Sequence, residues 1–346
     1  MPNTLPTDPQ LYTGIDIGGT KIHIADSSQP TVHHYRTADF RSPLDLLEKY
    51  FTVIGRRPAR IALAMAGPRN DTTGDIQLTN GSWPAFRLDE AKKQYPGTTF
   101  YTANDMLGAA AGVLAASSMD LRQLKPGAAT ATGTKIVVTI STGLAPAAAI
   151  LDGASGRHVL LATEGGHIGL QPKNSEEMAY LQYLQQKHPE THGHISAERA
   201  LAGRYGIDSL ADFLLAQHPA PALAAAITSA RKRGQATGTV LRAYATEGKG
   251  KDRQVAAAML AQLGAMLGSV LHDFALCYKA TGGIYLIGSV STGLAAYFAE
   301  NTAFCERIVN PGAAHDSWLT RIPLYLVTDP HIGAKGALRL AEQINP

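Results

Sequence analysis

The sequence predicts an α/β protein built from two domains. Apolar, strand-like runs alternate with helical stretches along all 346 residues, an order that is typical of mixed α/β folds. Two of these runs, at residues 12–25 and 136–151, turn back through glycine-containing turns and read as hairpins, each opening a new set of elements. A chain of this length with 45% hydrophobic residues buries large cores and divides into about two domains. We expect a smaller α/β domain at residues 1–108 plus 330–346, and a larger one with added helices at 109–329.

The other elements follow from hydrophobic periodicity and turn residues. In the first half of the chain, we expect strands at 59–66 and 98–103 and an alanine-rich helix at 105–116. After the second hairpin, we expect helices at 177–187, 197–201, 209–216 and 253–276, a strand at 283–287, a helix at 294–299, a strand at 322–327 and a terminal helix at 333–343.

Composition argues against several classes of protein. The 31 basic and 28 acidic residues leave a formal net charge of +3, and no run of like charges forms a footprint for nucleic acid. Cys277 and Cys305 are too few for a zinc cluster or a disulfide framework, and we expect both to be core thiols in a reducing compartment. The first residues lack the pattern of a signal peptide, and the alanine-rich stretches are interrupted before they reach membrane-spanning length. We therefore expect a cytoplasmic protein that binds neither nucleic acid nor membrane.

The turn of the first hairpin carries the sequence DIGGTK. Gly18 and Gly19 allow backbone amides to approach an anion, and Thr20 and Lys21 add a hydroxyl and a positive charge. Asp16, just before the turn, is placed to hold Mg²⁺ through water. The spacing fits neither the P-loop nor the dinucleotide-binding fingerprint. Taken alone, the hexapeptide also fits an ordinary hairpin turn with an exposed aspartate.

A second set of polar residues suits the hydroxyls of a sugar. Asn104 and Asp105 stand where an expected strand ends and a helix begins, a common place for ligands in α/β proteins. Asp105 fits either a helix N-cap or a general base. Glu164 and His167 flank two glycines, and with Glu198 they offer two carboxylates and an imidazole to a polyol. A metal site at His167 ranks lower because no second ligand lies at short spacing, and Glu198 also fits an exposed residue near a helix start.

An ordered series of motifs carries a family resemblance over nearly the whole chain. The motifs are DIGGTK, LTNGSW (78–83), ND (104–105), STGL (141–144), EGGH (164–167), SAERALAG (196–203), TGGIYLIG (281–288) and IPLYLVTD (322–329). This series resembles the bacterial-type glucokinase family of the actin-like ATPase superfamily. The resemblance implies an α/β, two-domain actin-like (ribonuclease H-like) sugar kinase fold, with glucose and ATP in the cleft between the domains, and a homodimer. It implies transfer of the γ-phosphoryl group of ATP to the 6-hydroxyl of glucose.

The resemblance also implies a role for individual residues. Asp105 is the implied catalytic base, and Asp16 the residue that organises Mg²⁺. The residues implied to bind the other sugar hydroxyls are Asn80, Asn104, Glu164, His167 and Glu198, with Thr79 lining the same side. The residues implied to contact ATP are Gly18, Gly19, Thr20, Lys21, Thr142, Gly143 and Gly288.

The chain departs from the family pattern at three positions, so more than one function stays open. Ala145 and Pro146 stand where the family has a glycine-rich turn, and Ser289 replaces the second glycine of a pair. The leading hypothesis is an ATP-dependent glucokinase. The alternatives are a catalytically silent sugar sensor and a kinase for another hexose or with another phosphoryl donor. The wider family of sugar kinases and repressors shares DIGGTK and EGGH, but its cysteine-rich zinc motif and N-terminal helix-turn-helix are not found here.

Overall fold

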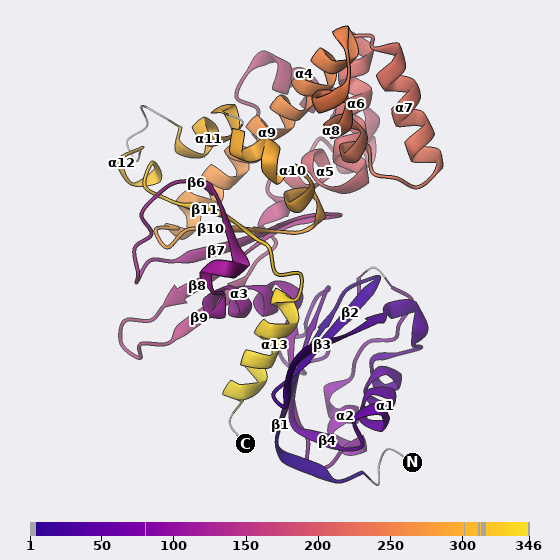
Figure 1. Cartoon of the computed structure of the whole chain (residues 1–346), viewed down its shortest axis with the longest axis vertical. Coiled ribbons are helices and arrows are strands. Elements are labelled where there is room, and N and C mark those ends of the chain that lie inside the picture. The colour runs from indigo at the N-terminus through magenta and orange to yellow at the C-terminus, as the bar shows by residue number, and fades with distance from the viewer. Residues whose placement is uncertain (1–4, 80, 301, 311, 313–315, 345–346) are drawn as a thin grey trace. The chain divides into compact units, whose positions relative to one another are not determined.

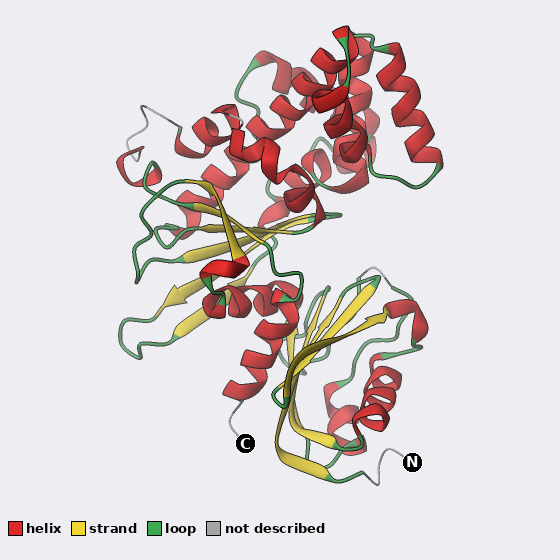
Figure 2. Ribbon diagram, in the orientation of Figure 1, coloured by secondary structure: helices red, strands yellow, loops and turns green. Residues whose placement is uncertain are grey.

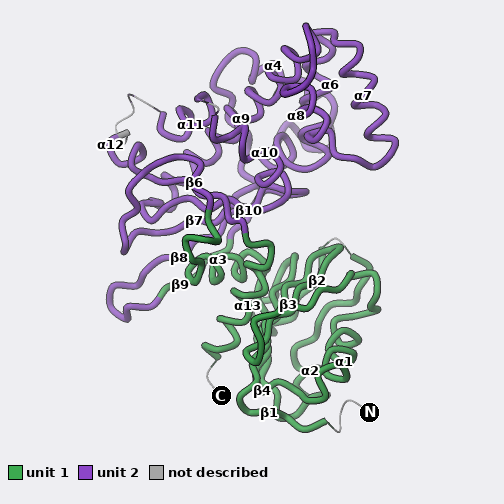
Figure 3. Tube along the Cα trace, in the orientation of Figure 1, with its two compact units in different colours: residues 1–121, 158–162, 329–346 green, residues 122–157, 163–328 purple. Residues whose placement is uncertain are grey.

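The structure is a computed structural model that describes residues 5–79, 81–300, 302–310, 312 and 316–344. It divides into two compact units (Figures 1 and 3): unit 1 is formed by residues 1–121, 158–162 and 329–346, and unit 2 by residues 122–157 and 163–328. Both units combine strands with helices, so the predicted α/β class is confirmed (Figure 2). The domain bounds expected from the sequence, with a break at residue 108, stay a prediction.

Unit 1 contains a five-stranded mixed sheet. Its strands are β1 (Thr7–Ile17), β2 (Lys21–Asp26), β3 (Gln29–Arg36), β4 (Arg57–Met65) and β5 (Thr99–Asn104), in the order β3-β2-β1-β4-β5. β1, β2 and β3 pair antiparallel, whereas β1, β4 and β5 run parallel. Ile17, Met65 and Asn104 lie in register across the parallel strands. The carboxyl ends of these strands therefore form one edge of the sheet, the usual position of ligands in such sheets.

The helices of unit 1 pack on this sheet and on each other. They are α1 (Pro43–Ile54), α2 (Leu88–Gln94), α3 (Asp105–Ala115) and α13 (Ile332–Gln343), and the short strand β9 (His158–Ala162) lies against α3. α13 packs on both α3 and β1. A Cβ atom at Gly336 would lie 1.8 Å from the carbonyl oxygen of Gly108, and one at Gly112 would lie 2.2 Å from that of Ile332. The two helices thus cross with their backbones in contact, which only glycine permits.

Unit 2 joins a second sheet to a large group of helices. Its strands β6 (Leu121–Lys125), β11 (Leu324–Val327), β10 (Ile284–Ile287), β7 (Lys135–Ile140) and β8 (Leu144–Leu151) neighbour one another in this order. β7 and β8 form the predicted antiparallel hairpin, and β7, β10 and β11 run parallel. The helices are α4 (Ser175–Lys187), α5 (Ala197–Leu201), α6 (Gly203–Gln217), α7 (Pro221–Lys232), α8 (Thr237–Glu247), α9 (Gly250–Tyr278), α10 (Ser289–Glu300), α11 (Thr302–Val309) and α12 (Asp316–Leu319).

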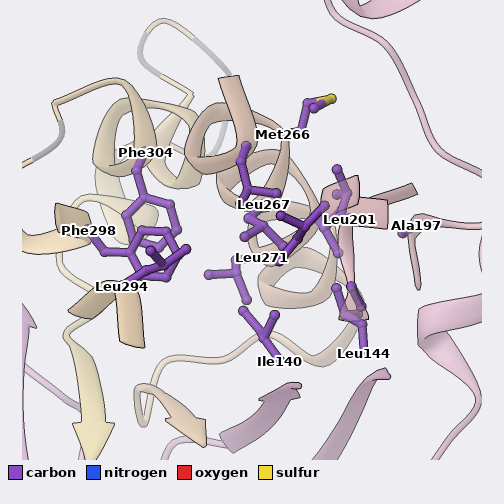
Figure 4. Close-up of a cluster of buried hydrophobic side chains, with 14 of the residues drawn as sticks. Ile140, Leu144, Ala197, Leu201, Met266, Leu267, Leu271, Leu294, Phe298 and Phe304 are labelled. Carbon is purple, nitrogen blue, oxygen red and sulfur yellow. The ribbon is translucent and has the colours of Figure 1, made fainter. Parts of the chain in front are cut away.

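Helix α9 forms the centre of the unit 2 core. Leu267 and Leu271 on α9 face the stacked rings of Phe298 and Phe304, whose centroids are 4.5 Å apart (Figure 4). A Cβ atom at Gly268 would lie 2.5 Å from the carbonyl oxygen of Phe304. This glycine therefore lets α11 approach α9 closely, and the large apolar side chains on either side are buried from water.

The length of α9 corrects one expectation from the sequence. An 18-residue window of this 29-residue helix has a mean hydropathy of 1.6, so by length and composition alone it could cross a membrane. The expectation that the alanine-rich stretches are interrupted before they reach membrane-spanning length was wrong for α9, although the helix itself was predicted at 253–276. However, 72% of the window is buried inside the protein, as in the core helix of a globular unit.

The two cysteines differ from the expectation that both are core thiols. Cys277, near the end of α9, is exposed, and Cys305 is only partly buried. The expectation was wrong for Cys277 because the apolar residues around it belong to a helix with one face toward solvent.

Candidate functional site

Two carboxylates, those of Asp16 and Asp105, lie at the carboxyl edge of the unit 1 sheet. Asp16 is the penultimate residue of β1 and pairs with Ala64 of β4, while Asp105 begins α3 directly after β5. Because β1, β4 and β5 are parallel, both side chains come to the same edge. The charge of Asp105 is near enough to raise the pKa of Asp16. Asp16 and Asp105, which the sequence predicted as separate site residues, therefore interact electrostatically.

Asp16 occupies a position that disfavours its charged form. Burial, and then the charge of Asp105, raise the pKa of Asp16 from 3.8 to about 7. About a quarter of the side chain (26%) remains exposed, so the carboxylate is still reachable from solvent. A divalent cation would offset both causes of the shift, and Mg²⁺ prefers carboxylate oxygens as ligands. The position of Asp16 therefore fits a residue that holds Mg²⁺.

Asn104 fixes the start of α3. Its Oδ1 accepts a hydrogen bond from the backbone N–H of Met106 at 2.9 Å, and its Nδ2 donates to the carbonyl oxygen of Gly67 at 3.2 Å. Asn104 is thus the N-cap of the helix, a role that the sequence had left open for Asp105. The N-cap interpretation of Asp105 was wrong: this residue is the first of the helix, and its Oδ1 also accepts from Met106 N–H, at 3.0 Å.

The glycine turn between β1 and β2 is held from one side by Thr37. The N–H of Gly18 donates to the carbonyl oxygen of Lys21 at 2.9 Å, and Thr37 Oγ1 donates to the carbonyl oxygen of Gly18 at 2.8 Å. The N–H of Thr37 donates to the carbonyl oxygen of Thr20 at 3.1 Å. The amide of Gly18 is therefore used inside the hairpin. Thr20 and Lys21 are exposed beside it, and Gly19 lies between them and Gly18.

The LTNGSW loop is anchored by two buried side chains. Leu78 and Trp83 are 2% and 5% exposed, and Trp83 Nε1 donates to the carbonyl oxygen of Phe40 at 2.8 Å. Thr79 between them is exposed, and its N–H donates to the carbonyl oxygen of Ala66 at 3.0 Å. Asn80, which the sequence assigns to sugar binding, lies outside the described residues.

In unit 2, the three residues predicted to bind sugar hydroxyls lie together. Nε2 of His167 is 3.7 Å from Oε2 of Glu164 and 3.9 Å from Oε1 of Glu198. Glu164 is mostly exposed, whereas Glu198 is the least exposed of the three at 31%. The other carboxylate oxygen of Glu198, Oε2, accepts from the N–H of Leu144 at 2.9 Å. A donor at this position orients one carboxylate oxygen and leaves the second to face the imidazole.

Glycines allow the STGL and EGGH segments to approach this cluster. A Cβ atom at Gly143 would lie 2.9 Å from Oε2 of Glu198, and one at Gly166 would lie 1.6 Å from the carbonyl oxygen of Leu144. The family resemblance implied contact with ATP for Gly143 and no separate role for Gly166. In the structure, their missing side chains make room for contacts that position Glu198 and Leu144.

Gly288 and the STG turn stand at the same edge of the unit 2 sheet. Ile287 of β10 pairs with Thr139 of the parallel strand β7, and the two segments follow these strands. Gly288 has a φ of +96°, and a Cβ atom there would lie 2.6 Å from the carbonyl oxygen of Ile140. The positive φ and the close contact both require glycine.

The three departures from the family pattern lie beside these turns. Ala145 and Pro146 are already part of β8, where they pair with Thr139 and Val138. Pro146 is buried against Gly165, whose Cβ atom would lie 2.7 Å from Cγ of the proline ring. Ser289 is the exposed first residue of α10. The three departures therefore lie outside Thr142, Gly143 and Gly288, the residues that the resemblance implies to contact ATP.

Sequence comparison identifies the family. The family model described as Glucokinase matches residues 14–344. The chain belongs to the glucokinase family. It is 30% identical to a glucokinase of Nitrobacter hamburgensis over 323 residues, which cover 91% of this chain and 92% of that protein. It is 29% identical to a glucokinase of Neisseria meningitidis serogroup C over 345 residues, 97% of this chain and 95% of that protein. The resemblance inferred from the motifs is confirmed.

Solved structures of the family and of related sugar kinases share the fold. A glucokinase from an Antarctic psychrotroph superposes with a TM-score of 0.78 at 24% identity, over 97% of this chain and 100% of that one. The glucokinase of Balamuthia mandrillaris, solved with glucose, gives 0.75 at 19% identity, over 96% and 94% of the two chains. A ROK family glucokinase of Streptomyces griseus, solved with glucose and AMPPNP, gives 0.57 at 18% identity, over 96% and 100%. The predicted two-domain, actin-like sugar kinase fold is confirmed.

Three residues near the predicted site were not found from the sequence. A Cβ atom at Gly333 would lie 2.4 Å from Oδ2 of Asp16, Thr37 holds the glycine turn, and the Leu144 amide binds Glu198. Gly333 begins the predicted terminal helix, which was the one available signal. Thr37 and Leu144 act through backbone or hydroxyl contacts for which the sequence carries no pattern.

Proposed function

We propose that the protein is a glucokinase that transfers the γ-phosphoryl group of ATP to the 6-hydroxyl of glucose. Membership of the glucokinase family supports the activity, and one structural observation carries the proposal furthest. The carboxylates of Asp16 and Asp105 stand at one sheet edge, near enough for one to shift the pKa of the other. Phosphoryl transfer needs one carboxylate near the attacking hydroxyl and another for the metal.

Asp105 is proposed to accept the proton of the sugar 6-hydroxyl. This residue is the first of α3 and follows the N-cap Asn104, so its backbone is fixed by the start of the helix. A base placed in this way orients the hydroxyl for in-line attack and takes up the proton as the bond to phosphorus forms. Most of the catalytic effect then comes from positioning and electrostatics rather than from an unusual chemical group.

Asp16 is proposed to hold Mg²⁺ through water. Mg²⁺ in kinases offsets the negative charge of the transferred phosphoryl group and its leaving group. Asp16 must lose its proton to take this role, and the raised pKa makes that loss dependent on pH near neutrality. Gly18, Gly19, Thr20 and Lys21 are proposed to lie along the phosphates of ATP.

The remaining polar residues are proposed to recognise the sugar and the nucleotide. Glu198 and His167 offer an oriented carboxylate and an imidazole, and Glu164 adds a second carboxylate. Sugar hydroxyls can donate to both acids and either donate to or accept from the imidazole. The proposed set for the sugar is completed by Asn80 and Asn104, and the proposed nucleotide contacts are Thr142, Gly143 and Gly288.

Release of ADP tests the proposed function. The purified full-length protein is given Mg-ATP with glucose, mannose, fructose or N-acetylglucosamine in turn, and glucose binding is measured in parallel by calorimetry. We expect ADP release that depends on sugar and is fastest with glucose. If glucose binds but no phosphoryl group is transferred from ATP or from any other donor tested, the sugar sensor is supported instead. A preference for another sugar would keep the kinase and change its substrate.

The same family membership supports two further expectations, a homodimer and a cytoplasmic location. Light scattering of the purified protein at several concentrations tests the first. A mass near twice the chain's 36.6 kDa is expected, and a single-chain mass at all concentrations would contradict it.

A further inference from the structure

Three histidines of unit 1 lie together at a place that no step of the proposed phosphoryl transfer uses. His23 and His34 stand directly opposite each other on the antiparallel strands β2 and β3, so their side chains share one face of the sheet. His331 is the residue directly before α13. The ring centroids are 4.6 to 5.2 Å apart in the three pairs, and one nitrogen of each ring lies within 4.8 Å of the others.

One buried polar atom of this cluster has no hydrogen-bond partner. Nδ1 of His331 is buried and has no hydrogen-bond partner, an arrangement that costs free energy unless something occupies the position. His34 is exposed, whereas His23 and His331 are half-buried. An ion could therefore enter from the side of His34 and reach the two enclosed rings.

Three imidazole ligands favour some metal ions over others. Zinc, copper, nickel and cobalt bind imidazole well, whereas Mg²⁺ prefers oxygen and would not compete for three nitrogens. In a tetrahedral zinc site with Zn–N bonds of about 2.0–2.1 Å, the ligand nitrogens stand about 3.3 Å apart. The observed separations of up to 4.8 Å can close by rotation of the rings, since the hairpin pairing of β2 and β3 already fixes two of the three backbones.

We propose that His23, His34 and His331 bind a divalent transition-metal ion of the zinc class through three imidazole nitrogens, with the fourth position open to water. One carboxylate, that of Asp16, stands beside a ring of the cluster, where partners of such ligands are commonly found, and a second, that of Asp329, fixes the backbone of His331. Oδ2 of Asp16 is 4.0 Å from Nδ1 of His23, and Oδ1 of Asp329 accepts the backbone N–H of His331 at 2.9 Å.

Occupancy of this site has a structural consequence. The ion would link the hairpin β2–β3 to the start of α13, two segments that are separated by about 300 residues of chain. An ion that binds only the folded protein stabilises it by mass action. We expect Zn²⁺ to raise the thermal midpoint of unfolding, and the gain to grow with the concentration of free Zn²⁺.

Metal binding is tested on the full-length, untagged protein after chelation and removal of the chelator. Zn²⁺ binding is measured by calorimetry, and Co²⁺ serves as a spectroscopic probe because tetrahedral Co²⁺ absorbs strongly in the visible range. We expect one ion per chain and a tetrahedral Co²⁺ spectrum. His34→Ala should weaken binding by about 100-fold and abolish this spectrum, and His331→Gln should do the same.

Two controls separate the site from general effects. His218→Ala removes an exposed histidine after α6 and should leave Zn²⁺ affinity unchanged. Thermal unfolding without metal checks that each variant is folded, and the exposed His34 is the safer of the two substitutions. Absence of stoichiometric binding, or equal affinity in His34→Ala and the parent, would overturn the proposal. Neither glucose nor ATP is present, so the result is independent of the kinase activity.

Discussion

Oδ2 of Asp16 lies so close to the first turn of α13 that a methyl group on Gly333 would stand 2.4 Å from it. A Cβ atom is not accommodated at that distance, so the backbone at Gly333 sets how far the carboxylate can move. The C-terminal helix therefore positions the residue that is proposed to hold magnesium.

Gly333→Ala should displace the Asp16 carboxylate and lower activity. A shift of about 1 Å in a catalytic group can cost about 100-fold in rate, and we expect kcat/KM for Mg-ATP to fall at least tenfold. Steady-state kinetics at varied Mg-ATP provides the measurement. The matched control is Gly293→Ala on α10, where an added Cβ atom meets nothing within 4 Å; it should keep full activity. Equal kinetics in the two variants would contradict the positioning role.

The raised pKa of Asp16 predicts how stability depends on pH. Because the pKa in the folded protein is about 7 and the ordinary value is 3.8, the folded state holds this proton more tightly than the unfolded state. The free energy of unfolding should therefore fall as pH rises from about 4 to about 7. Asp16→Asn removes this dependence, so it should be more stable than the parent at pH 8 and similar to it at pH 4.5.

Urea unfolding in the absence of divalent metal measures the effect of Asp16→Asn at the two pH values. A stability difference that is the same at pH 4.5 and pH 8 would show that Asp16 does not titrate in this range. The same titration predicts that kcat/KM for Mg-ATP decreases below about pH 7, because protonated Asp16 cannot serve the metal.

Gly143→Ala should weaken sugar binding through Glu198. The new methyl group would lie 2.9 Å from Oε2 of Glu198, and it would push the carboxylate away from the Leu144 amide. We expect KM for glucose to rise about tenfold or more, since a bond between a charged group and an amide is worth about 1.5–3 kcal/mol. Gly153→Ala, in a site with nothing within 4 Å, is the control, and an equal change in both variants would argue against this role.

Asn104 should contribute to stability as a helix cap. Asn104→Ala removes the acceptor for the N–H of Met106 and should cost about 1 kcal/mol in the free energy of unfolding. Asn104→Asp keeps an acceptor at the same position and should lose much less. Denaturant titration of both variants decides the point, and an equal loss in the two would show that the cap is not what Asn104 provides.

The parts of the site that the sequence predicted are those determined by local patterns. Asp16 and Asp105 follow apolar runs, and the structure places each at the carboxyl end of a parallel strand. The hairpin at 136–151 was also predicted, because its glycine turn lies between two apolar segments. Helix 105–116 was predicted to within one residue of α3.

Contacts between distant segments could not be predicted from one sequence. The approach of Gly333 to Asp16 and the meeting of His331 with His23 depend on how α13 packs on β1 and β2, about 300 residues further along the chain. Even the position of His34 opposite His23 depends on the pairing register of β2 and β3, which one sequence does not give. Single residues of this kind carry no local pattern that marks their partner.

Some helices were not predicted although they carried usable signals. α1 begins at Pro43 with Ser42 as its N-cap and ends at Gly55, whose φ is +69°, which is the common order of cap, proline and terminal glycine. α7 also begins with a proline, Pro221. The signals at their ends were sufficient, and the prediction relied too much on apolar periodicity.

The product formed from glucose and Mg-ATP decides whether the protein phosphorylates glucose at the 6-hydroxyl. Phosphorus NMR of the parent and of Asp105→Asn, with Asp71→Asn as a control at a 97% exposed aspartate, identifies both the ester and its position. We predict glucose 6-phosphate and ADP in equal amounts from the parent and the control. For Asp105→Asn, we predict turnover reduced by about 10²–10⁴-fold with glucose still bound. Unchanged product formation by Asp105→Asn would contradict its role as base, and bound glucose without any phosphate ester from the parent would contradict the kinase.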